Sequence, residues 1–155
     1  MTSLIHPNSS VSSSVKLGDN VKIGPFCNLD GNISIGDGTE LKSHVSITGN
    51  TSIGKNNIFY PFTNIGCEPQ DLKFSGEDSF LEIGDSNTFR ENVTVSKGTK
   101  DGGMITSIKN NNLFMTGVHI AHDCKINNNN IFVNQVTLAG HVNICLLYTS
   151  DAADE

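Results

Sequence analysis

The chain has 155 residues, enough for one domain, and its composition narrows the class of protein. Only 17% of the residues are charged, the formal net charge is −6, and lysine and arginine form no cluster, which argues against a nucleic-acid groove. No stretch approaches a membrane span, and residues 1–10 lack the charged and apolar regions of a signal peptide. We therefore expect a cytoplasmic protein with no nucleic-acid partner and no transmembrane segment.

From the N-terminus onward, an apolar residue recurs at every sixth position. The first series comprises Ile5, Val11, Leu17, Ile23, Leu29, Ile35, Leu41, Ile47, Ile53, Phe59 and Ile65. The ladder returns at Ile83, Phe89 and Val95, and then, shifted by one residue, at Ile108, Phe114, Ile120, Ile126, Phe132, Leu138 and Ile144. A fixed hexapeptide period is typical of a parallel β-helix, whereas an amphipathic α-helix would space apolar residues at i, i+3, i+4 and i+7.

A second inward position lies four residues after many of these apolar residues and holds small or medium side chains. Its members are Val15, Val21, Cys27, Ile33, Thr39, Val45, Thr51 and Thr63. Three hexads form one triangular coil of about 18 residues, so residue i should lie beneath residue i+18. Cys27 and Cys124 occupy this inward position and are expected to be core thiols, since the four cysteines show neither disulfide nor metal-site spacing.

Two interruptions break the ladder, one near residues 66–82 and one near residues 96–107. The first contains Gln70-Asp71-Leu72-Lys73, and the second contains Lys97-Gly98-Thr99. Insertions into a solenoid commonly mark a binding face, although the second could equally be a surface excursion. The sequence thus predicts an all-β parallel β-helix over residues 1–144 with two loop insertions.

Three of the five histidines are expected to converge on one corner of the coil. His141 follows His122 by one coil plus one residue, and His119 lies three residues before His122 in the stretch His119-Ile-Ala-His-Asp-Cys124. Such a cluster could bind a metal through neutral imidazoles, or a histidine could act as a general base on a hydroxyl. Asp123 directly follows His122, and at a corner it could orient the imidazole ring.

The hexapeptide rule fails after Ile144. The stretch 145–155 resembles the translation of a transposase adapter from sequencing libraries. We therefore expect residues 145–155 to be a non-native tail, a translated sequencing adapter, and the solenoid to be truncated at this point.

Several segments together resemble one enzyme family. They are Ile65-Gly-Cys-Glu-Pro-Gln-Asp-Leu-Lys-Phe-Ser-Gly-Glu77, His119-Ile-Ala-His-Asp-Cys124 and Leu138-Ala-Gly-His141. Over residues 1–144 the chain is similar to the UDP-N-acetylglucosamine O-acyltransferases, hexapeptide-repeat enzymes that take the first step of lipid A (lipopolysaccharide) biosynthesis. The resemblance implies a left-handed coil, against the usual right-handed crossover rule, and a homotrimer with active sites between subunits.

The resemblance also implies an activity and a set of site residues. The family moves a 3-hydroxyacyl chain from acyl carrier protein to the 3-hydroxyl of UDP-N-acetylglucosamine, without cofactor or metal. In family terms His122 matches the general base, Asp123 its orienting partner, and Gly140 the donor of a backbone N–H to the oxyanion. The positions that match substrate-binding residues are Gln70, Asp71, Leu72, Lys73, His119 and His141. Ser96 stands where some members carry a histidine.

In the family, the segment that would follow Ile144 supplies the last coils, the residues that gauge acyl length, and a helical domain. We therefore expect the 155-residue chain alone to be inactive, and the sequence does not reveal the acyl chain length. One alternative is a zinc hydratase of the gamma-class carbonic anhydrase type, in which three histidines hold the metal. Another is a non-catalytic solenoid that serves as a scaffold.

Overall fold

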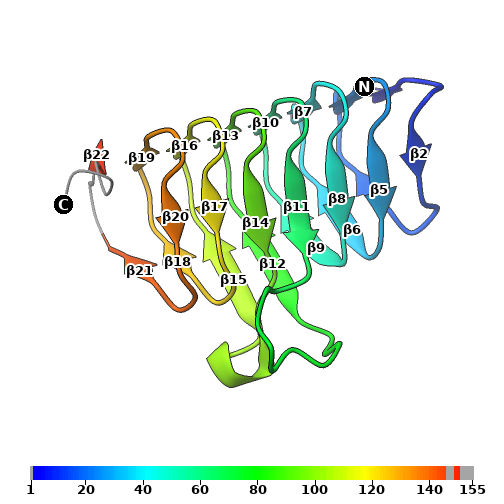
Figure 1. The fold of residues 1–155 in the computed structure, drawn as a ribbon. Helices are drawn as coiled ribbons and strands as arrows, with labels where there is room; N and C mark the ends of the chain where they lie inside the picture. The colour runs from blue at the N-terminus through cyan, green and yellow to red at the C-terminus, as the bar shows by residue number, and fades with distance from the viewer. Residues whose placement is uncertain (1, 146–148, 151–155) are drawn as a thin grey trace.

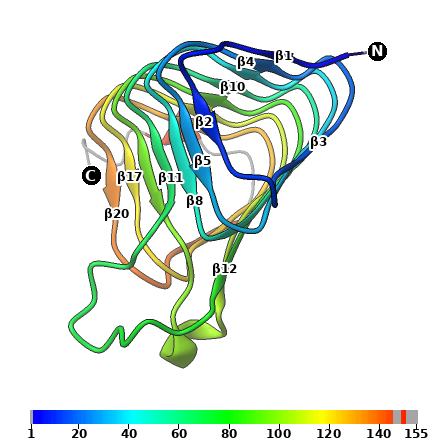
Figure 2. The ribbon, with the colours of Figure 1, turned by 90° about the vertical axis from the view of Figure 1, so that its right-hand side faces the viewer.

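The chain winds into a coil whose three sides are parallel β-sheets (Figure 1, Figure 2). The structure is a computed structural model that describes residues 2–145 and the backbone of residues 149–150. Consecutive strands of the chain belong to the three sheets in turn. Each strand therefore pairs with the strand three places earlier in the chain, which lies in the same sheet. Within the described residues, no helix has the length and hydropathy needed to cross a lipid bilayer.

The strands are short because each forms one side of a coil. The first sheet contains β1 (Leu4–Ile5), β4 (Lys22–Ile23), β7 (Glu40–Leu41), β10 (Ile58–Phe59), β13 (Thr88–Phe89), β16 (Leu113–Phe114), β19 (Ile131–Phe132) and β22 (Thr149–Ser150). The second sheet contains β2 (Ser10–Val11), β5 (Asn28–Asp30), β8 (Ser46–Thr48), β11 (Asn64–Cys67), β14 (Thr94–Ser96), β17 (His119–Ile120) and β20 (Thr137–Leu138). The third sheet contains β3 (Lys16–Leu17), β6 (Ile33–Ile35), β9 (Asn50–Ile53), β12 (Phe80–Ile83), β15 (Ile105–Ile108), β18 (Lys125–Ile126) and β21 (Asn143–Ile144).

The strand register confirms the predicted stacking of residue i on residue i+18. In the early coils Asn28 pairs with Ser46, and in the late coils His119 pairs with Thr137. Across the two interruptions the separation grows. Ile58 pairs with Thr88, and Thr88 pairs with Leu113, so each of these two coils is longer than a regular one. The surplus residues of the two long coils belong to the two predicted insertions, and the register on either side of them is kept.

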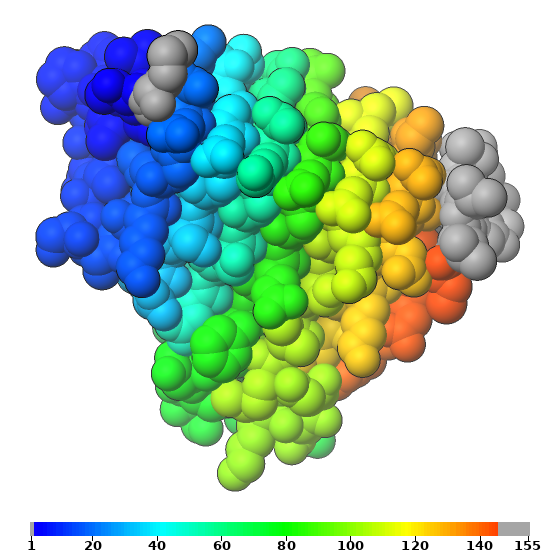
Figure 3. All heavy atoms as spheres, turned by 180° about the vertical axis from the view of Figure 1, so that it is seen from behind, coloured from blue at the N-terminus to red at the C-terminus, as the bar shows by residue number. Residues whose placement is uncertain are grey.

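Strand pairing extends into both ranges predicted as insertions. The backbone of Cys67 pairs with that of Ser96, and β12 begins at Phe80, so the residues outside the sheets are 68–79 and 97–104. The second of these segments contains a single 3-10 turn, η1 (Lys100–Gly102). Both segments leave the coil between a strand of the second sheet and a strand of the third sheet, and they project together from that corner (Figure 1, Figure 2). They form the bulge at the lower edge of the molecule in Figure 3.

The apolar ladder forms the core, as the hexapeptide period predicts. Its members from Ile23 to Phe132 are buried, and so are the inward thiols of Cys27 and Cys124. Four phenylalanines of the first sheet stack ring on ring at centroid distances of 4.7, 4.7 and 4.9 Å: Phe59, Phe89, Phe114 and Phe132. Beside them runs a buried ladder of asparagines, in which Oδ1 of each residue accepts the backbone N–H of the next: Asn57, Asn87, Asn112 and Asn130. These contacts repeat at the spacing that the parallel backbone pairing imposes on the coils, and the corners repeat at the same spacing.

Candidate functional site

The candidate residues gather at the corner between the second and third sheets. His122 and Asp123 lie between β17 and β18, and one coil further on Gly140 and His141 lie between β20 and β21. The first insertion leaves from the same corner two coils earlier, and the second insertion leaves one coil earlier. The corner position follows from the period, because equal steps along the chain return to the same edge of the coil.

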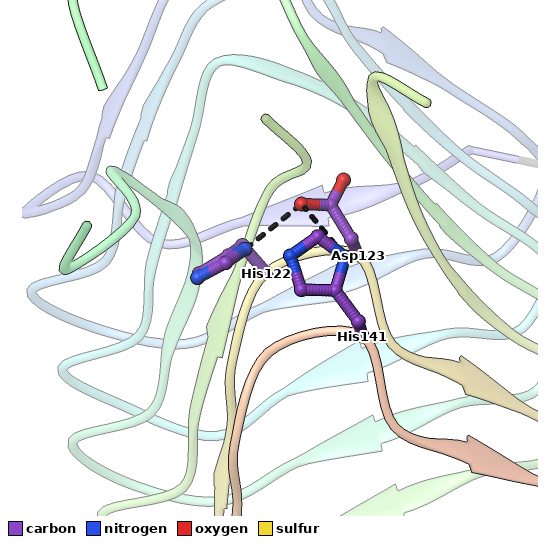
Figure 4. A group of neighbouring side chains, drawn as sticks. All are labelled: His122, Asp123 and His141. Atoms are coloured by element: carbon purple, nitrogen blue, oxygen red, sulfur yellow. Dashed lines mark hydrogen bonds and ion pairs between the residues drawn. The ribbon is translucent and has the colours of Figure 1, made fainter. Parts of the chain in front are cut away.

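The side chains of His122 and Asp123 meet although they are neighbours in sequence (Figure 4). Neighbours on a straight strand point to opposite faces, but Asp123 has a left-handed backbone (φ 61°) that turns its side chain toward the imidazole. Nδ1 of His122 lies 2.8 Å from Oδ2 of Asp123. Because an ionised carboxylate can only accept, we assign the proton to Nδ1, which leaves Nε2 as the basic nitrogen. The imidazole is 14% exposed and the carboxylate is fully buried.

The second insertion covers the Asp123 carboxylate. The Thr99 N–H donates to Oδ1 at 2.8 Å, and the Thr99 hydroxyl donates to Oδ2. The backbone N–H of Asp123 donates to the Thr106 hydroxyl at 2.8 Å. Gly102 packs directly on the carboxyl group, where a Cβ atom would overlap Cγ of Asp123. The insertion is therefore a cap on the buried acid, in contact with the candidate site.

Residues of the next coil pack against the His122 ring. The rings of His122 and His141 lie edge to face with centroids 5.1 Å apart, as their spacing along the chain predicts (Figure 4). Nδ1 of His141 is 4.0 Å from Oδ2 of Asp123. Gly140 lies against His122 so closely that a Cβ atom there would overlap the ring. The absence of a side chain at residue 140 therefore leaves the space that the imidazole occupies.

The first insertion forms one wall of an open hollow of about 530 Å³ in front of His122. The hollow is lined by Gln70, Asp71, Leu72, Lys73, His122, Gly140 and His141. Seven of the nine residues singled out from the sequence thus line one cavity. Asp71 comes nearest the catalytic candidate, with Oδ2 4.0 Å from Nε2 of His122. Leu72, on the same wall, is fully exposed.

His119 lies on β17, before the corner, and is not part of the close group formed by His122, Asp123 and His141 within the described residues. Its Nδ1 is 2.6 Å from the Thr94 hydroxyl of the preceding coil. Burial lowers the pKa of His119 below its usual value, and the charge of His122 lowers it further. His119 is therefore disposed to be neutral at pH 7 and able to exchange hydrogen bonds with an uncharged polar group.

The two insertions are joined to each other. Glu77 of the first insertion accepts hydrogen bonds from the backbone N–H of Ser75 at 2.9 Å and from that of Lys100 at 3.1 Å. The Lys97 ammonium lies 5.4 Å from the centroid of the Phe74 ring. The wall of the hollow and the cap on Asp123 therefore form one connected unit.

This connection predicts a pH dependence of stability. The hydrogen bonds from Ser75 and Lys100 lower the pKa of Glu77 from its usual value near 4.5 to about 2. A lowered pKa means that the carboxylate stabilises the folded chain at all pH values above about 4.5, and that this contribution is lost as the pH falls from about 4.5 toward 2. We expect Glu77→Gln to have a lower urea midpoint than the wild type at pH 7, with the difference narrowing below pH 4.5. Glu82→Gln is the matched control for the loss of one exposed charge. The prediction is contradicted if the difference in urea midpoint between Glu77→Gln and the wild type stays constant down to pH 3.

The distances among the side chains at this corner can be compared with those of a metal site. His122, Asp123 and His141 each offer a ligand atom within 4.8 Å of the others. However, the 2.8 Å between Nδ1 of His122 and Oδ2 of Asp123 is a hydrogen-bond length, while two ligands on a tetrahedral zinc ion lie about 3.3 Å apart. Among residues 2–145 of the single chain, the three histidines do not form one group, because His119 lies outside it; the zinc hydratase alternative would draw its histidines from two subunits.

Sequence reasoning missed Thr99 as a site residue. The segment Lys97-Gly98-Thr99 was singled out with no role for Thr99, yet this residue makes both hydrogen bonds that cap the Asp123 carboxylate. A signal was present, because the insertion interrupts the same corner one coil before Asp123. What could not be seen from the sequence is that this loop folds inward over the acid rather than outward into solvent.

The same fold and a similar sequence occur in known proteins. The acyl-[acyl-carrier-protein]–UDP-N-acetylglucosamine O-acyltransferase of Rickettsia canadensis (strain McKiel) is 54% identical over 121 residues, which cover 78% of this chain and 46% of that protein. The enzyme of the same name from Rickettsia bellii (strain OSU 85-389) is 54% identical over 122 residues, covering 79% of this chain and 43% of that protein. This chain is a homologue of the UDP-N-acetylglucosamine O-acyltransferases. No family model matches it.

Solved structures of UDP-N-acetylglucosamine acyltransferases agree with this assignment. The enzyme of Francisella novicida superposes with a TM-score of 0.88 at 45% identity, covering 90% of this chain and 51% of that one. The enzyme of Moraxella catarrhalis gives the same TM-score at 46% identity, covering 90% of this chain and 55% of that one. The fold is thus the left-handed parallel β-helix of these acyltransferases. The chain spans about half the length of the relatives it matches.

Proposed function

We propose that the full-length gene product containing this chain is an O-acyltransferase. It moves a 3-hydroxyacyl chain from acyl carrier protein to the 3-hydroxyl of UDP-N-acetylglucosamine, the first step of lipid A biosynthesis. The observation that carries the proposal is the His122–Asp123 pair facing a hollow of about 530 Å³, in a chain homologous to such enzymes. The free thiols of Cys27, Cys67 and Cys124 agree with a reducing, cytoplasmic location.

In the proposed mechanism His122 is the general base. Its Nε2 takes the proton of the sugar hydroxyl as the oxygen attacks the thioester carbon, while Asp123 stabilises the imidazolium that forms. The new carbon–oxygen ester bond forms, the carbon–sulfur bond breaks, and the imidazolium returns the proton to the departing thiolate of the carrier. The backbone N–H of Gly140, which has no acceptor among residues 2–145, donates to the oxyanion of the tetrahedral intermediate.

The remaining residues of the corner are assigned to binding. Lys73 places a point charge at the hollow, which suits a diphosphate or the phosphate of a phosphopantetheine arm. Gln70, Asp71 and Leu72 line the same wall, and His119 and His141 are assigned to the sugar pocket. A homotrimer, with the neighbouring subunit completing the open side of the hollow, is part of the proposal.

The direct test is an acyl-transfer assay with purified full-length gene product, 3-hydroxyacyl carrier protein and UDP-N-acetylglucosamine. Formation of the 3-O-acylated sugar nucleotide supports the proposal, and its absence with all acyl lengths would reject it. We expect the 155-residue chain assayed alongside to be inactive, because it spans about half the length of its relatives. Stoichiometric zinc in the purified protein, together with hydratase activity, would favour the alternative instead.

Gly140→Ala provides a sharper test of the geometry. A methyl group at residue 140 would overlap the His122 ring, so the imidazole must move away from its position at the hollow. Since misplacing a reacting group by about 1 Å can cost about 100-fold, we expect kcat to fall by about that factor. The urea midpoint, measured on the same sample, separates displacement of the ring from loss of the fold. A kcat within threefold of the wild type would show that the corner tolerates the methyl group.

A further inference from the structure

The Asp123 carboxylate is held by one residue of a different coil. Its two oxygens receive two donors from Thr99, the backbone N–H on Oδ1 and the hydroxyl on Oδ2. Oδ2 is also the atom that accepts from Nδ1 of His122 at 2.8 Å. The Asp123 side chain is fully buried and Thr99 is 2% exposed, so bulk water cannot replace either bond. Two donors on two oxygens fix the plane of the carboxyl group, which neither donor could do alone.

Thr99 is itself held in place by the turn that follows it. Its carbonyl oxygen accepts the backbone N–H groups of Gly102 at 3.2 Å and Met104 at 2.9 Å, which close the turn around η1. The next residue, Lys100, donates its N–H to Glu77 of the first insertion. Gly102 packs on the carboxyl group itself. The Thr99 hydroxyl is therefore a fixed donor aimed at Oδ2.

The orientation of the carboxylate matters because it decides which nitrogen of His122 carries the proton. With Oδ2 facing Nδ1, the neutral imidazole keeps its proton on Nδ1 and presents Nε2 to the hollow as a base. A carboxyl group free to rotate about its last bond would hold this tautomer less firmly. The second insertion thus acts on His122 without touching the hollow, since Thr99 is not among the residues that line it.

We propose that Thr99 is a positioning residue for His122: through its two hydrogen bonds to Asp123 it fixes the carboxylate in the orientation that keeps the His122 proton on Nδ1. The inference deepens the proposed function and rests on it for its effect on rate. Its effect on the imidazole tautomer does not depend on acyl transfer and can be measured separately.

The test uses three variants of the full-length gene product. Thr99→Val keeps the branched shape and the backbone N–H but removes the hydroxyl, and Thr99→Ser restores a hydroxyl. Thr63→Val is the matched control, because the Thr63 hydroxyl is also fully buried but has no hydrogen-bond partner within the described part of the chain. Thr99→Ala serves as a second hydroxyl-free variant if the valine variant does not fold.

We expect Thr99→Val to lower kcat about 10- to 100-fold, the range for loss of a hydrogen bond to a charged group, with KM changed by less than about twofold. Thr99→Ser should keep kcat within about threefold of the wild type, and Thr63→Val should match the wild type. Nitrogen-15 NMR of the histidine side chains should show one tautomer of His122, protonated on Nδ1, in the wild type and a mixture in Thr99→Val.

The NMR result decides the inference. Retention of the pure Nδ1–H tautomer in Thr99→Val and Thr99→Ala would overturn it, whatever the rates. Failure of the proposed function would look different, because the wild type would then lack acyl transfer while the tautomer still responded to the loss of the Thr99 hydroxyl.

Discussion

Replacing His122 with alanine is expected to abolish most of the acyl-transfer activity of the full-length gene product. General-base catalysis by a positioned side chain contributes about 10²- to 10⁴-fold, and we expect kcat to fall within that range. KM for UDP-N-acetylglucosamine should change little, because Gln70, Asp71, Lys73 and His141 still line the hollow. The measurement is a steady-state assay of transfer from 3-hydroxyacyl carrier protein, with substrate saturation curves for both variants.

The chain offers a matched control in His6, a histidine next to β1 at the N-terminal end of the coil. Its ring accepts the backbone N–H of Asn8, far along the coil from the corner that carries His122. His6→Ala should retain wild-type kcat and KM. If His122→Ala keeps activity within tenfold of the wild type, His122 is not the base, and another group must deprotonate the hydroxyl.

Replacing Phe89 with alanine is expected to cause the largest loss of stability. Phe89 is fully buried, and its ring stacks between those of Phe59 and Phe114 at 4.7 Å on each side. The coils above and below are held by backbone pairing of β13 with β10 and β16, so they cannot collapse into the space left by the ring. Phenylalanine-to-alanine changes of this kind cost about 3–5 kcal/mol in the free energy of unfolding, and the unrelaxed cavity favours the upper part of that range.

Urea denaturation followed by far-ultraviolet circular dichroism measures this loss. Leu72→Ala is the control, because the Leu72 side chain is fully exposed on the first insertion and its removal should change the free energy of unfolding by less than about 0.5 kcal/mol. A loss below about 1 kcal/mol for Phe89→Ala would mean that neighbouring coils do close the cavity, and that the solenoid is more deformable than its paired strands indicate.

The two insertions show how one corner of a regular solenoid becomes different from the others. A coil of identical corners offers many equivalent positions, and nothing in the period distinguishes one from another. Here the corner between the second and third sheets is modified in four successive coils: by residues 68–79, by residues 97–104, by His122 and Asp123, and by Gly140 and His141. The first modification makes a wall, the second caps the buried acid, and the last two supply the imidazoles.

The part of this arrangement that repeats could be predicted from the sequence. The hexapeptide period determined which side chains point inward, and the length of a regular coil placed His122 and His141 on one corner, where their rings are 5.1 Å apart. These contacts follow from backbone register, which propagates from coil to coil through parallel pairing and so depends only on counting residues. The tail over residues 145–155, predicted to be a translated adapter, lies outside the described side chains apart from Cys145 and stays a prediction.

Only the tertiary structure decided how the insertions fold. Asp71 approaches within 4.0 Å of His122, a residue far along the chain, and Thr99 reaches inward to Asp123. Neither contact follows from the hexapeptide period. The paths of these loops depend on contacts between the two insertions. In the main ones, Glu77 accepts a hydrogen bond from the Lys100 N–H, and the Lys97 ammonium lies over the Phe74 ring. Such contacts join residues distant in sequence through side chains whose spacing carries no repeat, and so counting along the chain cannot reveal them.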